Sequence, residues 1–203
     1  DPEHMLSLEK APDGWDLESR RLRKRDMTAI VSGFRPFGSY DFNPTMDAAN
    51  RFDGKKMAGI RVHGLVLPAT YDAFDEVSKK IIDVNPDMVL SVGFASMYPS
   101  LTLEMGGKNE IFSKYADAKG MKPDHEKIVK GGKRYLNVNA DAETLAAFIA
   151  EAGIPVEVSK DADTFICNSL IYNAMHNIMN RSDAQSPIYF AFMHAPGTDE
   201  YAS

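Results

Sequence analysis

The segment DADTFICNSLIYNAMHNIM, residues 161–179, joins a reactive side chain to a clear helical pattern. It contains Cys167, the single cysteine of the chain. Asp163 and Thr164 are residue types that cap helices, so we expect a helix to begin there, with the thiol in its first turn. The apolar residues that follow recur every three or four positions, as on a helix that buries one face; they are Leu170, Ile171, Ala174, Met175 and Ile178.

The first turn of a helix is a setting that favours a reactive cysteine. Unpaired N–H groups and the helix dipole stabilise negative charge there, and thiols in such places ionise more readily than free cysteine. A lone cysteine is otherwise most often a small buried hydrophobe. The pattern therefore leaves two interpretations of Cys167 open, a nucleophile and a core residue.

Composition and charge limit the class of protein. Of the 203 residues, 44% are hydrophobic and 26% are charged, which is typical of a globular domain. The net charge of −6 provides no general attraction for nucleic acid, so no such partner is expected. A single cysteine allows no internal disulfide, no apolar run approaches the roughly 20 residues that cross a bilayer, and nothing resembles a signal peptide. We therefore expect a cytoplasmic protein without a membrane partner.

The chain is expected to divide into a short extension and one domain. Residues 1–4 resemble an expression-vector remnant, and residues 5–27 an N-terminal extension with a short helix over 12–26. Basic side chains cluster on this helix, which is typical of a solvated face and less often of a surface for nucleic acid or an acidic partner; they are Arg20, Arg21, Arg23, Lys24 and Arg25. Residues 28–203 are expected to form a single domain.

Strand and helix patterns alternate through this domain. Apolar and β-branched runs predict strands at 28–33, 60–68, 87–93, 101–104, 156–158 and 187–194. Helical spacing predicts helices at 44–52, 71–84 and 142–152, and the segment 106–132 is expected to be mostly irregular. This alternation predicts an α/β fold, a single domain of three layers (α/β/α) with a mostly parallel central sheet.

Reactive groups in such sheets gather beyond the carboxyl ends of the strands. The strand at 156–158 leads into the segment with Cys167, and the last strand ends at His194. We therefore expect the thiol and the imidazole to meet at one rim, as nucleophile and general base. Glu104 is the candidate for the group that orients the imidazole, although His194 and Glu104 taken singly also suit structural roles. The histidines lack the spacing of metal ligands, so no metal site is expected.

Several separated motifs together resemble a known family. They are SGFRPFG at 32–38 followed by Asn43-Pro44, TFICN at 164–168 and FMHAP at 192–196. In this order they resemble pyrrolidone carboxyl peptidase, also called pyroglutamyl peptidase I, a family of cysteine peptidases that remove an N-terminal pyroglutamate. The resemblance runs from about residue 29 to residue 196.

The resemblance implies a role for each matched residue. Cys167 would be the nucleophile that forms a thioacyl-enzyme, His194 the general base and Glu104 the third catalytic residue, with no cofactor. A small apolar slot would grip the pyrrolidone ring, because a flat uncharged lactam packs well between aromatic faces and a charged N-terminus would lose its hydration there. The slot would lie next to Phe94 and be lined by Phe34, Phe37, Phe165 and Ile166. Phe34 and Phe37 would equally suit a plain core.

Two stretches depart from the family pattern. After Gly93 the family usually has Gln-Ala-Gly-Gly-Arg, where this chain has Phe-Ala-Ser-Met-Tyr at 94–98. After the catalytic glutamate it usually has Arg-Val-Ala-x-Asn, where this chain has Met-Gly-Gly-Lys-Asn at 105–109. Two functions therefore stay open: a peptidase that acts on pyroglutamyl peptides, and a catalytically impaired member that binds a small ligand or a protein. The family often forms multimers, so the resemblance leaves a homo-oligomer open.

Overall fold

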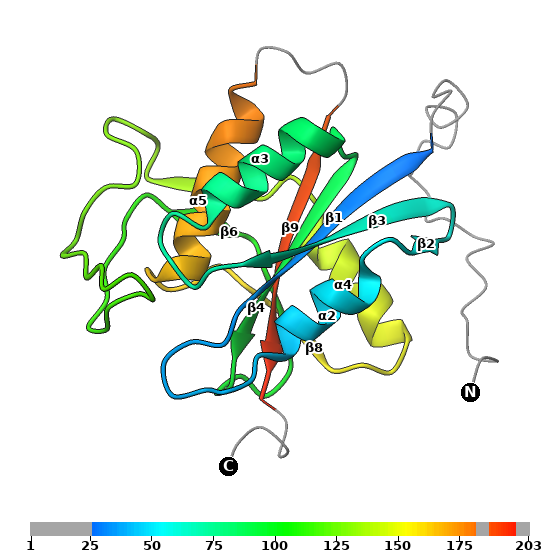
Figure 1. The fold of residues 1–203 in the computed structure, drawn as a ribbon, viewed down its shortest axis with the longest axis horizontal. Coiled ribbons are helices and arrows are strands. Elements are labelled where there is room, and N and C mark those ends of the chain that lie inside the picture. The colour runs from blue at the N-terminus through cyan, green and yellow to red at the C-terminus, as the bar shows by residue number, and fades with distance from the viewer. Residues whose placement is uncertain (1–25, 182–186, 198–203) are drawn as a thin grey trace.

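A seven-stranded sheet forms the centre of the computed structural model, which describes residues 26–181 and 187–197. Its strands lie in the order β2-β3-β1-β4-β9-β5-β8 (Figure 1). Their bounds are β1 Met27–Phe34, β2 Lys56–Met57, β3 Ile60–Leu67, β4 Met88–Ala95, β5 Leu101–Glu104, β8 Val156–Ser159 and β9 Tyr189–Pro196. The described residues include α2 Pro44–Phe52, α3 Phe74–Val84, α4 Ala142–Glu151 and α5 Ile166–Met179. The helix predicted at 12–26, with its basic residues, lies outside the described part of the chain.

The sheet consists of two blocks of opposite direction. In the first block, β3, β1, β4 and β9 pair in parallel, and the short β2 lies antiparallel at its edge. In the second block, β5 and β8 pair in parallel. The blocks meet where β5 pairs antiparallel with β9. The predicted α/β fold with a mostly parallel sheet is confirmed, but the reversal between the blocks was not predicted.

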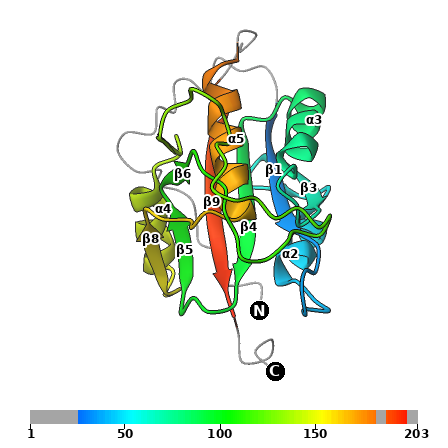
Figure 2. The same ribbon diagram turned by 90° about the vertical axis from the view of Figure 1, so that its left-hand side faces the viewer.

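Helices cover both faces of the sheet. Ile30 and Phe34 of β1 belong to the core cluster to which α3 and α5 contribute. Gly33 points to the other face, where a Cβ would lie only 1.9 Å from the carbonyl oxygen of Thr45 in α2. Alternate residues of one strand thus contact helices of different layers, and α3 and α5 share the face opposite α2. Figure 2 shows α5 in front of the sheet, running roughly along β9.

The helix after β1 begins as the sequence predicts. The side chain of Asn43 accepts a hydrogen bond of 3.0 Å from the N–H group of Thr45, which caps α2. Pro44 follows in the first turn, where a missing N–H group costs nothing. The loop 35–43, which carries the predicted slot residue Phe37, is therefore held between a buried strand and a capped helix.

The segment 106–132 is mostly irregular, as predicted, apart from one short strand and one isolated bridge. β6 Gly106–Lys108 pairs antiparallel with β7 Tyr135–Asn137 in a separate two-stranded sheet, and Ile111 forms an isolated bridge with Glu126. Gly106 allows this pairing, because a Cβ there would lie 2.3 Å from the carbonyl oxygen of Leu136. Strands of three residues are too short to show a hydrophobic period, which explains why β6 and β7 were not predicted.

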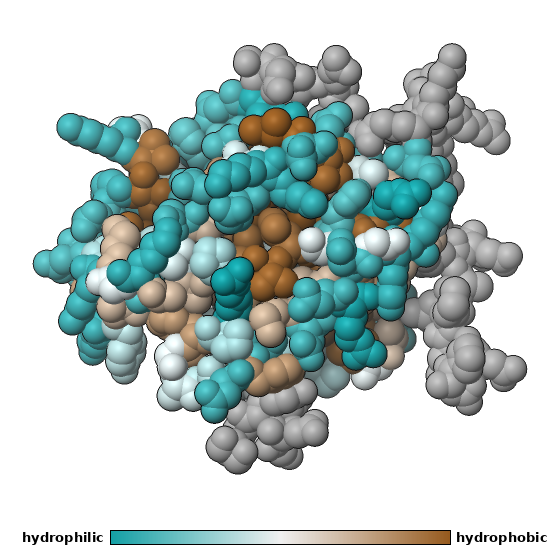
Figure 3. Space-filling model, in the orientation of Figure 1, coloured by the Kyte–Doolittle hydropathy of each residue, from teal (hydrophilic) through white to brown (hydrophobic). Residues whose placement is uncertain are grey.

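The surface is mostly hydrophilic on the face seen in Figure 3, with hydrophobic residues gathered near its centre, over the strands between α2 and α3. No helix in the described ranges is long and apolar enough to cross a membrane.

Candidate active site

Cys167 lies in the first turn of α5, as predicted, but the helix begins differently. The N-cap residue is Phe165, whose side chain accepts no hydrogen bond from the first N–H groups. Thr164 donates its hydroxyl hydrogen to the carbonyl oxygen of Phe112 at 2.9 Å, and Asp163 adopts a left-handed backbone with φ of 62°. The predicted capping by Asp163 and Thr164 is therefore wrong, because Thr164 holds a neighbouring loop instead.

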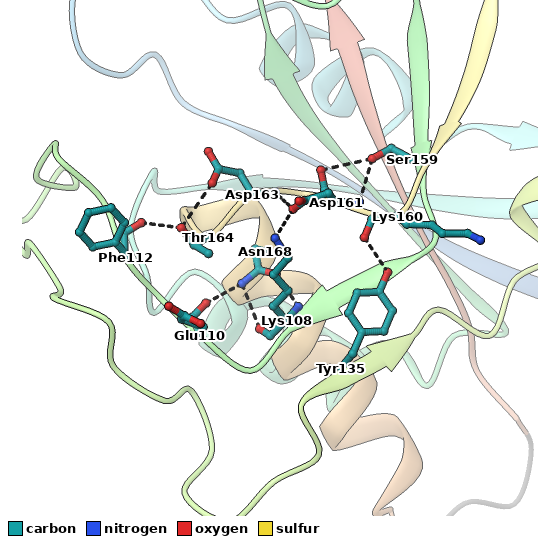
Figure 4. Close-up of polar contacts among 10 residues, drawn as sticks. All are labelled: Lys108, Glu110, Phe112, Tyr135, Ser159, Lys160, Asp161, Asp163, Thr164 and Asn168. Atoms are coloured by element: carbon teal, nitrogen blue, oxygen red, sulfur yellow. Dashed lines mark hydrogen bonds and ion pairs between the residues drawn. The ribbon is translucent and has the colours of Figure 1, made fainter.

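Polar contacts tie the start of α5 to β6 and to the segment after β8 (Figure 4). The buried side chain of Asn168 accepts from the N–H group of Lys108 at 2.6 Å and donates to the carbonyl oxygens of Lys108 and Glu110 at 3.1 and 2.8 Å. The ammonium group of Lys108 pairs with Asp161 at 2.5 Å. These contacts fix the backbone next to Cys167 and so fix the position of the thiol.

The route by which Cys167 reaches the site differs from the prediction. β8 is parallel to β5, and β5 is antiparallel to β9, so the carboxyl end of β8 points away from the rim where β9 ends. Residues 160–165 then carry the chain back to the level of His194. The expectation that reactive groups gather beyond the carboxyl ends of the strands placed the thiol at the correct rim. It assumed, however, that β8 and β9 run in the same direction.

His194 lies near the carboxyl end of β9 and is hydrogen-bonded to Glu104. Its Nδ1 atom is 2.8 Å from Oε1 of Glu104. The two side chains share one face because β5 and β9 pair with Thr102 opposite His194 and Glu104 opposite Phe192. Glu104 is fully buried and His194 is 5% exposed. The carboxylate predicted to orient the imidazole is thus in place to do so, across the boundary of the two blocks.

Gly93 lies beneath the thiol and the imidazole. A Cβ at this position would be 2.9 Å from Sγ of Cys167, 2.9 Å from Cδ2 of His194 and 3.0 Å from Cζ of Phe192. Real Cβ contacts are longer, so no other residue fits without displacing these groups. The missing side chain of Gly93 is what allows Cys167 and His194 to approach the same point of the sheet.

The charges around His194 change its protonation. Burial is the largest single influence and lowers the pKa of the imidazole, but the charge of Cys167, hydrogen bonds to Cys167 and Glu104, and the charge of Glu104 together raise it from 6.5 to about 10. The imidazole is therefore protonated at neutral pH when the thiolate is present. A thiolate beside an imidazolium can attack an electrophilic carbon and return a proton to a leaving group.

A narrow pocket opens beside the thiol. Its volume is about 120 Å³, well below the roughly 300–1,000 Å³ of sites for drug-sized ligands. Most of its lining is aromatic or aliphatic; the lining residues are Phe34, Arg35, Phe37, Tyr40, Phe42, Asn43, Ala69, Phe94, Phe165, Ile166 and Cys167. All five residues predicted to contact a substrate are among them. The pocket can hold one small, flat and uncharged group.

A second cavity, of about 470 Å³, lies between α3 and the end of α5. Its lining contains no cysteine, histidine or carboxylate, which makes it a poor candidate for chemistry; it consists of Phe74, Ser78, Ile81, Ile82, Asn85, Asn177, Ile178 and Arg181. Within residues 26–181 and 187–197, no three side chains of histidine, cysteine, aspartate or glutamate are arranged to hold a metal ion.

Sequence reasoning did not identify two residues of this site. Gly93 was read only as the end of a strand, yet it lies directly under the thiol and the imidazole. Tyr98 was noted only as a departure from a motif, yet its ring lies 5.3 Å from the imidazole of His194. Neither spacing nor residue type indicates such contacts, because they depend on which strands are neighbours.

Comparisons with known proteins agree with this geometry. A family model described as pyroglutamyl peptidase matches residues 27–202. The pyrrolidone-carboxylate peptidase of Chromobacterium violaceum is 31% identical over 176 residues, covering 86% of this chain and 80% of that protein. The corresponding peptidase of Pyrococcus furiosus is 30% identical over 171 residues, with coverage of 84% and 81%.

Solved structures lead to the same group of proteins. A mutant pyrrolidone carboxyl peptidase from P. furiosus superimposes with a TM-score of 0.81 at 28% identity, covering 86% of this chain and 83% of that one. The pyrrolidone carboxyl peptidase from Thermococcus litoralis has the same TM-score, 0.81, at 27% identity, with coverage of 86% and 79%. The similarity thus extends over nearly all of the described residues in both sequence and fold.

Proposed function

The chain belongs to the pyroglutamyl peptidase family, and from this premise we propose that it hydrolyses the amide bond that follows an N-terminal pyroglutamyl residue. The observation that supports this most is the meeting of Cys167 and His194 over Gly93, beside a small aromatic pocket. The pocket would hold the lactam ring, and the scissile carbonyl would then lie next to the thiol.

In the first half of the proposed reaction, the thiolate of Cys167 attacks the carbonyl carbon of the scissile amide. The negative charge that develops on the carbonyl oxygen is stabilised by N–H groups at the start of α5, which point toward that position. The imidazolium of His194 gives its proton to the amide nitrogen as the C–N bond breaks. The shortened peptide leaves as an amine, and a thioester remains on Cys167.

In the second half, water releases the acyl group. His194 is now neutral and removes a proton from a water molecule, whose oxygen attacks the thioester carbon. The C–S bond breaks, pyroglutamic acid leaves, and the pair of thiolate and imidazolium is restored. Glu104 accepts a hydrogen bond from Nδ1 throughout, which keeps the other ring nitrogen directed at the reacting atoms.

Specificity in this proposal depends on the absence of charge. The aromatic lining packs against the flat lactam ring, which carries no charge that must lose its hydration. A free N-terminal amine carries a positive charge, and moving it into the same pocket costs several kcal/mol unless an anion compensates it. Prolyl peptides carry a ring of similar size with a charged nitrogen, so they are the natural comparison substrate.

The test is hydrolysis of a fluorogenic pyroglutamyl amide in reducing buffer, compared with the prolyl amide of the same dye. We expect cleavage of the pyroglutamyl substrate and at least about 100-fold less of the prolyl one. Cys167→Ala should reduce the rate to background, and iodoacetamide should do the same to the wild type, since the chain has one cysteine. A reduced, folded wild type without turnover would contradict the proposal.

A second candidate function is binding without cleavage. It is motivated by Glu104, whose Oε2 atom is buried and has no hydrogen-bond partner among the described residues. A buried carboxylate held on one side only gives weaker support to the imidazole. Calorimetry with the pyroglutamyl amide distinguishes the two functions, because binding to the wild type with no turnover would favour this second candidate.

A further inference from the structure

Tyr98 contacts the imidazole that the proposed reaction uses. Its ring centroid is 5.3 Å from that of His194 with the planes at 73°, an edge-to-face arrangement. Phe192 makes a similar contact with the same imidazole, at 5.1 Å and 66°. Aromatic pairs of this geometry are attractive beyond the area they bury. His194 therefore has one ring contact from its own strand and one from the loop that follows β4.

The loop that carries Tyr98 is braced on three sides. The N–H group of Tyr98 donates to the carbonyl oxygen of Ala95 at 3.0 Å, which closes a turn. The hydroxyl of Ser96 is 2.8 Å from that of Tyr40 across the pocket. Gly197 packs against the same turn so closely that a Cβ would lie 2.5 Å from the carbonyl oxygen of Ser96. The position of the Tyr98 ring is thus determined by the fold.

The other support of His194 fixes only one atom of the imidazole. Glu104 holds Nδ1 through Oε1, and its own Oε2 has no hydrogen-bond partner among the described residues. The bond from Glu104 fixes Nδ1 but does not by itself set the tilt of the ring that directs the other nitrogen at Cys167. The edge-to-face contacts with Tyr98 and Phe192 act on the ring itself and restrict that tilt.

Tyr98 stays neutral in this environment. Burial raises the pKa of its hydroxyl most, and the negative charges of Glu104, Cys167, Asp163 and Asp161 raise it further. The groups whose charge acts on His194 are Cys167 from α5 and Glu104 from β5. Tyr98 adds no charge to this set, so its contribution is steric and aromatic.

We propose that Tyr98 is a positioning residue, whose ring holds the imidazole of His194 in line with the thiol of Cys167. The role in peptide cleavage rests on the proposed function, whereas the effect on the thiol itself does not. The ring, rather than the hydroxyl, performs this role, because the contact with the imidazole is made by the ring.

The experiment measures alkylation of Cys167 by iodoacetamide from pH 5 to pH 9 in Tyr98→Ala, Tyr98→Phe and the wild type. The single cysteine makes the reaction unambiguous. We expect Tyr98→Ala to react at least about tenfold more slowly at pH 6, because the thiolate is the reacting form and a well-placed imidazolium stabilises it. Tyr98→Phe should react within about twofold of the wild type, since it keeps the ring contact.

Met97→Ala is the matched control, because Met97 lies in the same turn but is 87% exposed. It should leave the profile unchanged. A Tyr98→Ala profile equal to that of the wild type would overturn the proposal, and so would a Tyr98→Phe profile as slow as that of Tyr98→Ala. Rapid alkylation of the wild type at pH 6 without cleavage of the pyroglutamyl amide would contradict the proposed function alone.

Discussion

At the scale of single residues, the site depends on Gly93, which has no side chain. Gly93→Ala would add a methyl group 2.9 Å from both Sγ of Cys167 and Cδ2 of His194. Because the thiol and the imidazole must then separate, we expect kcat to fall by at least about 100-fold, with about 1–3 kcal/mol lost from the free energy of unfolding. Steady-state kinetics and urea denaturation measure the two effects.

Gly153→Ala separates a loss of stability from a loss of activity. Gly153 follows α4 with φ of 77°, and no atom lies within 4 Å of a Cβ placed there. An alanine should cost about 1–2 kcal/mol through backbone strain alone and leave kcat unchanged. Equal kcat values for Gly93→Ala and Gly153→Ala would show that the contact over Gly93 does not matter.

The protonation of His194 provides a second prediction at this scale. In the wild type the pKa of the imidazole is raised to about 10, and the charge of Cys167 is the largest of the influences that raise it. The imidazole should therefore stay protonated from pH 6 to pH 8. In Cys167→Ser the neutral hydroxyl removes this charge, so the pKa should fall while the opposing effect of burial remains.

NMR of the imidazole Cε1–H resonance measures this difference. The wild-type resonance should not move between pH 6 and pH 8, and the Cys167→Ser resonance should begin to titrate at lower pH than in the wild type. The same midpoint in both proteins would mean that Cys167 carries no charge next to the ring.

These residues also mark the limit of what sequence could predict. Cys167, His194 and Glu104 could be placed because each follows or ends a recognisable element and matches a family motif. Gly93 and Tyr98 could not, since their role comes from contacts between β4, β9 and α5 that no local pattern encodes. The Thr164 hydroxyl, likewise, bonds to a loop distant in sequence and not to the helix it precedes.

At the scale of elements, α5 is positioned mainly through Asn168. Its side chain makes three hydrogen bonds to the backbone of residues 108–110 from a fully buried position. Asn168→Ala would leave these backbone groups unpaired inside the protein, so we expect a loss of about 3 kcal/mol in the free energy of unfolding. The alkylation rate of Cys167 should fall as well, because the thiol is on the preceding residue.

Asn173→Ala is the matched control on the same helix. The amide of Asn173 bonds only to the backbone and hydroxyl of Ser169, one turn earlier, so its removal should cost about 1 kcal/mol or less. Urea denaturation measures the free energy of unfolding of both variants. Similar losses for the two would contradict the role of Asn168 in joining α5 to β6.

Long elements were predictable and short ones were not. α2 and α5 and the buried strands β1, β3, β4 and β9 have clear periods or apolar runs, and the predicted bounds agree to within a few residues. β6 and β7 have three residues each and no period, so they were missed. The helix α3 begins at Phe74 and not at residue 71, because residues 70–73 form a turn first.

At the scale of the whole molecule, the two blocks of the sheet are joined by a shorter ladder than the parallel ladders within the first block. β4 and β9 pair over eight residues within the first block, whereas β5 and β9 pair over three at the boundary. Because a short ladder opens more easily than a long one, we expect amides of β5 and β8 to exchange with deuterium before those of β4 and β9. Mass spectrometry of peptides covering these strands measures the order.

A ligand in the aromatic pocket should slow this opening. The pocket lies beside Cys167, and Cys167 contacts the residues that join the blocks; binding to the closed form alone stabilises it. Equal exchange in both blocks, with or without a pyroglutamyl ligand, would contradict the prediction. The direction of the second block could not be predicted from sequence, since alternating strands and helices suggest a parallel arrangement throughout.

Since Glu104 comes from one block and His194 from the other, the three reactive groups assemble only in a completely folded chain. A copy in which the smaller block has detached would leave the imidazole of His194 without its carboxylate partner. Because the shorter ladder should open first, we expect the bond between Glu104 and His194 to be lost while the larger block is still folded.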